Sequence, residues 1–205
     1  MYAPAHARAT DTAWMREEVA RLGFGVLFSA AGGAPMATHL PMIWDGEELV
    51  GHIARANPHW QHWVGEGSPA IAVFQGPNAY VSPGFYPSKA EHGRVLPTWN
   101  YVAVHVEGTA IAVSEPAALL RLVALQTDLM ERDRPVPWKV SDAPDAFVEG
   151  QLKGIVGVRL RVHALSGTRK LSGNRSPADR AGVIAGLAAG DAGARAVAAL
   201  MRERN

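Results

Sequence analysis

Residues 24–53, FGVLFSAAGGAPMATHLPMIWDGEELVGHI, decide the fold of this chain. The stretch contains three short apolar segments rich in Val, Ile, Leu and Phe, and the turn sequences Gly32-Gly33 and Asp45-Gly46 separate them. Short segments of this kind joined by such turns are typical of antiparallel strands. The expected strands are residues 24–30, 35–44 and 48–53.

The same pattern continues beyond this stretch. Gly76-Pro77-Asn78 is expected to be a turn between two further strands. The clearest strand alternates strictly, with Val158 and Leu160 facing one way and Arg159 the other. These further strands are residues 70–75, 79–82, 98–114 and 155–167.

Helices are expected around the strand-rich region. Asp11 is placed to cap a helix that ends at Leu22. Asn57-Pro58 has the cap and first-turn residues of a short helix that runs through Trp63. Residues 83–97 contain three prolines and two glycines and are expected to be a surface or active-site loop. The other expected helices are residues 114–130, 145–152, 177–189 and 192–204.

Strands flanked by helices predict an α+β fold built on a small β-barrel of six or seven short strands. The chain has 205 residues, of which 48% are hydrophobic and 19% charged, and these values are those of an ordinary globular protein. We therefore expect one domain over residues 1–205, with a helical C-terminal segment at about 176–205.

Charge and cysteine content exclude several classes of site. The net charge is only +1, which disfavours a dedicated nucleic-acid or membrane-surface protein. The absence of cysteine excludes disulfides, thiolate metal sites and a cysteine nucleophile. The first residues lack the apolar core of a signal peptide, and no later run is long enough to span a membrane. A cytoplasmic protein is expected.

Residues 51–63, GHIARANPHWQHW, hold three histidines, one arginine and two tryptophans. A metal site is disfavoured, because the stretch supplies no carboxylate beside His59 and His62. These two histidines are instead expected to line the surface of a short helix whose tryptophans are buried. We therefore predict no metal, even though His39 and His52 lie on preceding strands.

An anion suits the same stretch better. The helix start at Asn57-Pro58 offers free N–H groups, and Arg55 can donate two hydrogen bonds to phosphate oxygens. Thr38 and His39 on a neighbouring strand add a hydroxyl and an imidazole. The alternative is that Arg55 is only an exposed charge at a strand end, and the residues alone leave both interpretations open.

Two further clusters carry polar chemistry. Residues 98–101, TWNY, can stack on a planar ring and hydrogen-bond its edge, or can form an aromatic cluster at a barrel rim. Residues 170–175, KLSGNR, form a basic, donor-rich loop that weakly indicates an anion. Nucleophile-elbow, dinucleotide-binding and P-loop motifs are absent.

Taken together, several separated motifs resemble one family, the PaiB-type FMN-binding negative transcriptional regulators. The resemblance spans nearly the whole chain and implies an FMN-binding split β-barrel, similar to pyridoxamine phosphate oxidases, with peripheral helices. It also implies a homodimer that holds two flavins at the subunit interface. The motifs are MYAPAHA (1–7), THLP (38–41), GHIARANPHW (51–60), FQGPNAYVSPGFY (74–86), PTWNYVAVHVEG (97–108), KLSGNR (170–175) and DRAGV (179–183).

The resemblance also implies a division of roles within the flavin site. Two strands would grip the ribityl chain and the phosphate, and Arg55 with the Asn57-Pro58 helix start would take the phosphate. The TWNY cluster would come from the partner subunit, and the loop after residue 169 would close the site. The chain departs from the family pattern at Phe85 and Gly173, to which no role is assigned. The implied cofactor-binding residues are Thr38, His39, Leu40, His52, Ala54, Arg55, Asn57, Trp99, Asn100, Tyr101, Lys170, Ser172 and Asn174.

Three functions remain open at this stage. The family resemblance implies a flavin-dependent transcriptional repressor that acts on DNA directly or indirectly. The best DNA-reading candidate is the C-terminal helix pair with Arg195, Arg202 and Arg204, although Ala-rich packing helices are the favoured interpretation. The second function is an FMN-dependent oxidoreductase acting on an unknown small molecule, and the third is a flavin carrier or haem-handling protein. The sequence identifies no residue as a catalytic acid or base.

Overall fold

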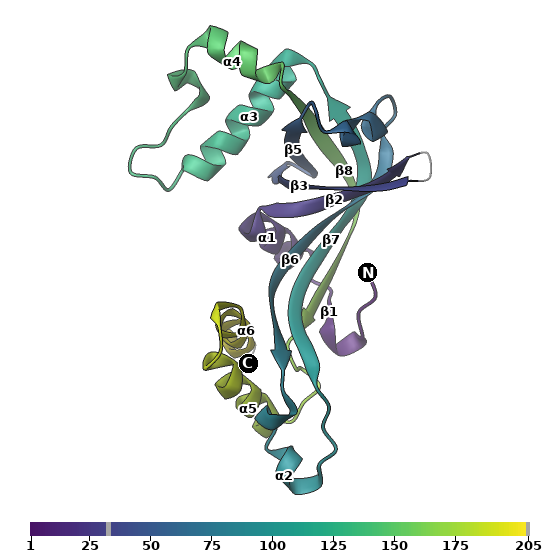
Figure 1. The fold of residues 1–205 in the computed structure, drawn as a ribbon, viewed down its shortest axis with the longest axis vertical. Coiled ribbons are helices and arrows are strands. Elements are labelled where there is room, and N and C mark those ends of the chain that lie inside the picture. Colours follow the sequence, from purple (N-terminus) through teal and green to yellow (C-terminus); the bar gives the residue numbers. More distant parts are fainter. Residues whose placement is uncertain (32–33, 204–205) are drawn as a thin grey trace. The chain divides into compact units, whose positions relative to one another are not determined.

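The structure is a computed structural model that describes residues 1–31 and 34–203 (Figure 1). In the described part of the chain, the strands form one sheet in the order β3-β2-β6-β7-β8-β5-β4, and β1 pairs with β8 off this path. The strands are β1 (Arg8–Ala9), β2 (Phe24–Ala31), β3 (Ala34–Pro41), β4 (Ile43–Asp45), β5 (Glu48–Ala54), β6 (Ser68–Val81), β7 (Thr98–Val113) and β8 (Ile155–Lys170).

Helices complete the α+β architecture. The α-helices are α1 (Thr12–Leu22), α2 (Ser88–His92), α3 (Pro116–Glu131), α4 (Asp145–Leu152), α5 (Pro177–Ala188) and α6 (Ala192–Glu203). The 3-10 helices are η1 (Ala5–Ala7), η2 (Pro58–Trp63), η3 (Pro83–Phe85) and η4 (Val140–Asp142). No helix in the described ranges is both long and apolar enough to cross a membrane.

The chain forms two compact units. One, called the barrel unit, comprises Arg16–Phe74 and His105–Leu165. The other, called the terminal unit, comprises Met1–Met15, Gln75–Val104 and the chain from Ser166 onward.

The sheet of the barrel unit curls back on itself. Strands β3 and β4 stand at opposite ends of the strand order, yet only Met42 separates them in the chain. Strand β5 consequently passes close to the end of β3, and a Cβ added to Gly51 would lie 2.6 Å from the carbonyl oxygen of Pro41. Glycine is needed there because no side chain fits between the two backbones. The predicted antiparallel barrel is confirmed.

The registers of the paired strands place the buried side chains inside this barrel. Strand β2 pairs antiparallel with β3, which brings Leu27 opposite Thr38, and β5 pairs antiparallel with β8, which brings Leu49 opposite Leu160. Leu27, Leu49 and Leu160 are almost fully buried. Outward-facing Arg159 and Arg161 are exposed, so the alternation predicted for the last strand is confirmed.

The terminal unit has a core of its own. Helices α5 and α6 bury Val183, Leu187, Val197 and Met201 against residues of β6 and β7. The interpretation of these helices as packing elements is therefore confirmed. Arg202 remains exposed on α6, whereas Arg204 lies outside the described residues, as does the predicted turn at Gly32-Gly33.

The turn predicted at Gly76-Pro77-Asn78 is wrong, because β6 runs through it without a break. Strand β2 pairs only with residues 70–73 of β6, so Pro77 lies on a stretch without a β2 partner. A strand edge tolerates proline, because a missing N–H costs no ladder bond there.

Other boundaries also differ from the prediction. The strand expected over residues 35–44 divides at Met42 into β3 and β4, and the expected loop 83–97 contains η3 and α2. Helix α3 is capped by Glu115 rather than Ser114, since the Glu115 carboxylate accepts hydrogen bonds from two backbone N–H groups. Strands β6, β7 and β8 are 14 to 16 residues long and are not the short strands predicted.

Candidate functional site

A buried polar network lies between β2, β3 and η2 in the barrel unit. Its centre is His59, whose side chain is fully buried. His59 Nδ1 lies 2.8 Å from Thr38 Oγ1, and His59 Nε2 lies 2.8 Å from Ser29 Oγ. Trp63 Nε1 also donates to Ser29 Oγ at 3.1 Å. His59 is therefore an interior group. The prediction that it lines the surface of a helix is wrong.

Asn57 joins this network from the start of η2. Its Oδ1 accepts a hydrogen bond from the backbone N–H of His59 at 3.0 Å, and its Nδ2 donates to Thr38 Oγ1 at 3.1 Å. The predicted cap and Pro58 at the first helical position are thus confirmed, although the helix is 3-10. The backbone N–H of His59 thus orients Asn57, and the His59 ring orients Thr38.

His59 is neutral at ordinary pH. Burial, with a smaller contribution from neighbouring His62, lowers the pKa of His59 from 6.5 to about 4. A neutral ring has one donor and one acceptor nitrogen, which matches the two hydroxyls on either side of it. The network therefore holds the side chain of Thr38, one of the predicted cofactor residues, in place.

Arg55 is exposed at the end of β5, and backbone groups already take part of its guanidinium. Its Nε donates to the carbonyl oxygen of Lys153 and its Nη2 to that of Ile155, each at 2.9 Å. The remaining N–H groups are available for a ligand, because arginine carries five donors. Arg55 also lines a cavity of about 340 Å³ together with Lys153 and Glu149.

The other predicted residues of the barrel unit have different surroundings. His52 Nδ1 lies 2.7 Å from Gln126 Oε1, while the Gln126 amide donates to the Pro41 carbonyl, so His52 Nδ1 carries the proton. His39 is exposed and stacks on Phe24. Leu40 is buried in the core and Ala54 is exposed, so their side chains do not join the network.

The terminal unit brings a second set of predicted residues together. Asn100 Nδ2 donates to Ser172 Oγ at 2.9 Å, and Lys170 Nζ donates to Thr98 Oγ1 at 2.9 Å. These four side chains border a cavity of about 180 Å³, which is also lined by Pro4, His6, Asn174 and Arg175.

His6 and Arg175 were not among the predicted site residues. Both belong to the family-like motifs MYAPAHA and KLSGNR, and this membership is the sequence signal that could have identified them. Ser29 and His59 were missed for another reason. A serine in an apolar strand and a histidine beside tryptophans carry no local mark of burial.

Trp99 lies on a separate groove of the terminal unit. It is 52% exposed and meets Tyr80 edge-on, with 6.3 Å between ring centroids. The groove has a volume of about 560 Å³, and Phe85 and several glycines of the C-terminal helices also line it. An exposed indole beside a groove of this size can stack on a planar ring, as the sequence predicted. Tyr101, two residues further on, is half-buried.

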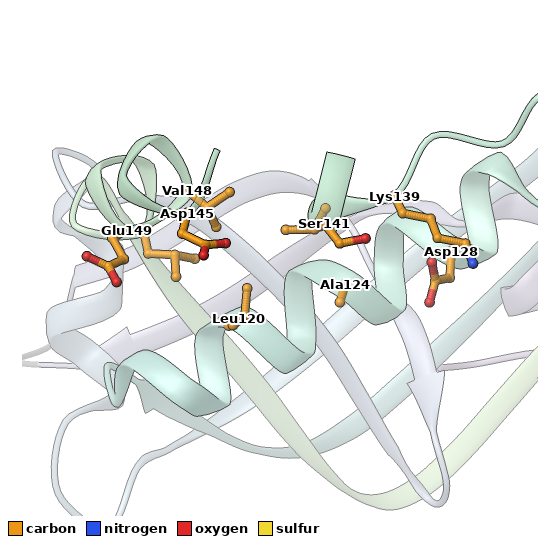
Figure 2. A pocket seen from close by; sticks show the side chains of 10 residues that line it. Leu120, Ala124, Asp128, Lys139, Ser141, Asp145, Val148 and Glu149 are labelled. Carbon is orange, nitrogen blue, oxygen red and sulfur yellow. The ribbon is translucent and has the colours of Figure 1, made fainter. Parts of the chain in front are cut away.

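A third cavity lies between α3, η4 and α4 in the barrel unit (Figure 2). Its volume is about 460 Å³, and Leu120 and Ala124 face it from α3. Three carboxylates, those of Asp128, Asp145 and Glu149, border it against the single cation Lys139. An excess of negative charge disfavours the phosphate of a flavin here.

Residues 1–31 and 34–203 contain no group of three His, Asp or Glu side chains placed to hold a metal ion. Around His59 and around Lys170, the polar side chains that converge are hydroxyls, amides, imidazoles and cations. Such groups bind oxygen-rich, anionic or hydrogen-bonding organic ligands.

Comparison with known proteins gives consistent results. Residues 1–164 match the family described as "Putative FMN-binding domain". The protease synthase and sporulation protein PAI 2 of Bacillus subtilis is 33% identical over 190 residues, covering 90% of this chain and 87% of that protein.

Solved structures share the fold at low identity. A FAD and heme binding protein from Mycobacterium smegmatis superposes with a TM-score of 0.61 and 15% identity, covering 80% of this chain and 73% of that one. The flavocytochrome Anf3 from Azotobacter vinelandii superposes with a TM-score of 0.59 and 12% identity, covering 82% of this chain and 72% of that one. The predicted α+β split β-barrel is confirmed.

Proposed function

The chain belongs to the family of FMN-binding domains, and from this premise we propose that it is a PaiB-type flavin-dependent negative regulator of transcription. The observation that carries the proposal is the family match over residues 1–164, together with 33% identity to the Bacillus subtilis protein along most of both chains. The flavin is FMN in this proposal, and it lies at the interface of a homodimer.

Each unit, taken by itself, has side chains that suit a part of a flavin. An isoalloxazine ring needs a flat apolar partner, which the half-exposed Trp99 beside its groove provides. The ribityl hydroxyls need polar partners that are held in place, and the network around His59 holds the Thr38 hydroxyl in this way. Bound FMN would supply a redox-active ring, while the chain itself binds, orients and shields that ring.

The proposed binding residues are those that the family resemblance implies. Arg55 contacts the phosphate from one subunit with the N–H groups that it does not donate to Lys153 and Ile155. Asn57, which donates to Thr38 and accepts from His59, holds the adjoining helix start in place. Trp99 and Tyr101 contact the ring from the other, which requires the dimer, whereas Asn100 between them is buried and borders the small cavity beside Lys170. The large exposed aromatic side chains Trp99 and Tyr80 support such an interface, because aromatic residues are enriched in protein–protein contacts.

Two measurements on the purified protein test the proposal. Oxidised flavin bands should be present in the absorbance spectrum, or should appear in the protein fraction after FMN is added. An electrophoretic mobility shift with DNA from upstream of the chain's own gene should show a complex that depends on flavin. Absence of FMN binding at tens of micromolar rules out the cofactor, and a Soret band instead indicates haem.

The alternative function is an FMN-dependent oxidoreductase, which the same flavin site would serve. Bleaching of the bound flavin by NADH or NADPH distinguishes it from the regulator. Rapid bleaching without any DNA complex favours the enzyme, whereas a DNA complex with a flavin inert to both donors favours the regulator.

A further inference from the structure

We propose that the cavity bordered by Lys170, Arg175 and His6 in the terminal unit is a binding pocket for a phosphate group. The cavity has a volume of about 180 Å³. This is roughly the share of liquid volume of six water molecules. It accommodates a phosphate with a few waters and is too small for a flavin ring system.

The two strong cations of the pocket have donors to spare. Lys170 Nζ donates one hydrogen bond, to Thr98 Oγ1, and an ammonium has three N–H groups. The Arg175 guanidinium lies over the Tyr86 ring at 4.7 Å and makes no hydrogen bond within the described part of the chain. Stacking on a ring leaves the edge of a guanidinium free, and that edge carries the donors that match phosphate oxygens.

The pocket is also positive overall. None of the described residues that line it is a carboxylate. The nearby Asp179 accepts hydrogen bonds from the Ser88 backbone N–H at 3.1 Å and the Ser88 hydroxyl at 2.9 Å, and its charge also interacts with Arg175, so it offsets only part of the positive charge of the pocket. The cations Lys170 and Arg175 share one small cavity and repel each other, and an anion bound between them relieves that repulsion.

A buried polar pair holds the walls of the pocket in place. Asn100 and Ser172 are 1% and 6% exposed and exchange two hydrogen bonds, Nδ2 to Oγ at 2.9 Å and Oγ to Oδ1 at 3.2 Å. Ser172 has a φ of 57°, which is uncommon for a residue other than glycine. This conformation turns the chain after Lys170 so that Asn174 and Arg175 line the same cavity.

The phosphate has two chemically equivalent sources. It is either the 5′-phosphate of the flavin or that of a separate phosphate ester. Only the first rests on the proposed function, so the experiment uses inorganic phosphate as the probe and treats flavin binding as an independent measurement.

The test measures the melting temperature and calorimetric affinity of the whole chain for inorganic phosphate, at constant ionic strength set with sodium chloride. Binding to the folded state should raise the melting temperature. Lys170→Gln and Arg175→Gln should each weaken phosphate binding by roughly tenfold or more, because each removes a charge-assisted hydrogen bond. Arg175→Lys should bind phosphate with an affinity between those of the wild type and Arg175→Gln, because it keeps the charge and loses the planar pair of donors.

Lys89→Gln is the matched control, because Lys89 is an exposed cation of the same unit that does not line the cavity. It should bind phosphate as the wild type does. Circular dichroism without phosphate identifies any variant that fails to fold. Equal phosphate responses in the wild type, Lys170→Gln and Arg175→Gln overturn the proposal, as does a wild type that responds to phosphate no more than to chloride.

Repeating the titration with FMN-saturated protein separates the two sources. If the flavin phosphate occupies the pocket, FMN abolishes the phosphate response, and the two glutamine variants lose affinity for FMN but not for riboflavin. If a separate ester binds there, the response persists and FMN affinity is unchanged. A chain that responds to phosphate but binds no flavin supports the pocket and contradicts the proposed function.

Discussion

At the scale of single residues, Arg55 divides its donors between the protein and a proposed ligand. Two of its N–H groups hold the carbonyls of Lys153 and Ile155, which fixes the guanidinium at the end of β5. A guanidinium fixed in this way loses little further freedom when it binds a phosphate. Its exposure and its backbone hydrogen bonds are compatible with both interpretations from the sequence, a phosphate-binding residue and an exposed charge at a strand end.

Arg55→Ala separates these interpretations. If Arg55 pairs with the flavin phosphate, the substitution removes about 1.5–3 kcal/mol and weakens FMN binding by roughly ten- to a hundredfold. Riboflavin, which lacks the phosphate, should bind the wild type and the variant equally weakly. Fluorescence titration with both flavins measures the contrast.

Arg159→Ala is the control for Arg55, since Arg159 is an exposed arginine on β8 that pairs with Glu48. It should leave both flavin affinities unchanged. If Arg55→Ala binds FMN as tightly as the wild type, the phosphate is held by other residues, and the pocket at Lys170 becomes the main candidate.

His59 makes the stability of the barrel unit depend on pH. Its pKa is lowered from 6.5 to about 4 by burial, so the unfolded chain binds the proton more readily. The contribution of neutral, buried His59 to the free energy of unfolding is therefore fully present above pH 6.5 and is lost as the pH falls towards 4. The free energy of unfolding should fall by on the order of 3 kcal/mol across that range because of this residue.

Urea unfolding at several pH values, for the wild type and His59→Asn, measures this contribution. The variant should be less stable at neutral pH, because the hydroxyls of Ser29 and Thr38 lose their partner. Its dependence on pH between 6.5 and 4 should be flatter. His163→Asn, an exposed change on β8, should keep the slope of the wild type. An unchanged slope in His59→Asn would show that other groups cause the acid sensitivity.

At the scale of elements, closure of the barrel depends on the approach of β5 to β3. Gly51→Ala places a methyl group 2.6 Å from the Pro41 carbonyl oxygen and 3.1 Å from the Leu40 side chain. Backbone cannot give way as a flexible side chain can. We expect a loss of about 1–3 kcal/mol in the free energy of unfolding, measured by urea denaturation.

Gly150→Ala is the matched control at this scale. Gly150 lies in α4, and a Cβ added there would meet no atom within 4 Å. Alanine favours the helix by up to about 1 kcal/mol, so this variant should be as stable as the wild type or slightly more stable. A Gly51→Ala protein as stable as Gly150→Ala would mean that β3 and β5 separate at little cost.

At the scale of the whole molecule, the proposed flavin site needs two chains. Sedimentation velocity at micromolar concentration should therefore show a dimer, with a total buried surface of more than about 2,000 Å² if the interface is obligate. Trp99→Asp should shift the sedimentation towards monomer and release flavin at the same time, because the indole serves both roles in the proposal. A monomer with flavin still bound contradicts the shared site.

The amino-acid sequence by itself determined the family and most of the elements, though not all of their boundaries. Alternation in β8, the hairpins of β2 to β5 and the Asn57 cap follow from side-chain patterns within a few residues, where local sterics and hydrogen bonds act. Half of the residues that line the proposed phosphate pocket were also predicted as site residues from the sequence, because they belong to separated motifs that resemble one family. They are Asn100, Lys170, Ser172 and Asn174.

Only the tertiary structure decided which groups are buried and which meet. The sequence predicted His59 to be a surface residue, whereas β2 and β3 enclose it in the structure. Strand β6 stays extended through Gly76-Pro77 because β7 lies beside it. The phosphate pocket joins His6 to Arg175, residues brought together when β1 pairs Arg8 with Thr168. Burial and convergence depend on pairing between residues far apart in the chain, and no local pattern records it.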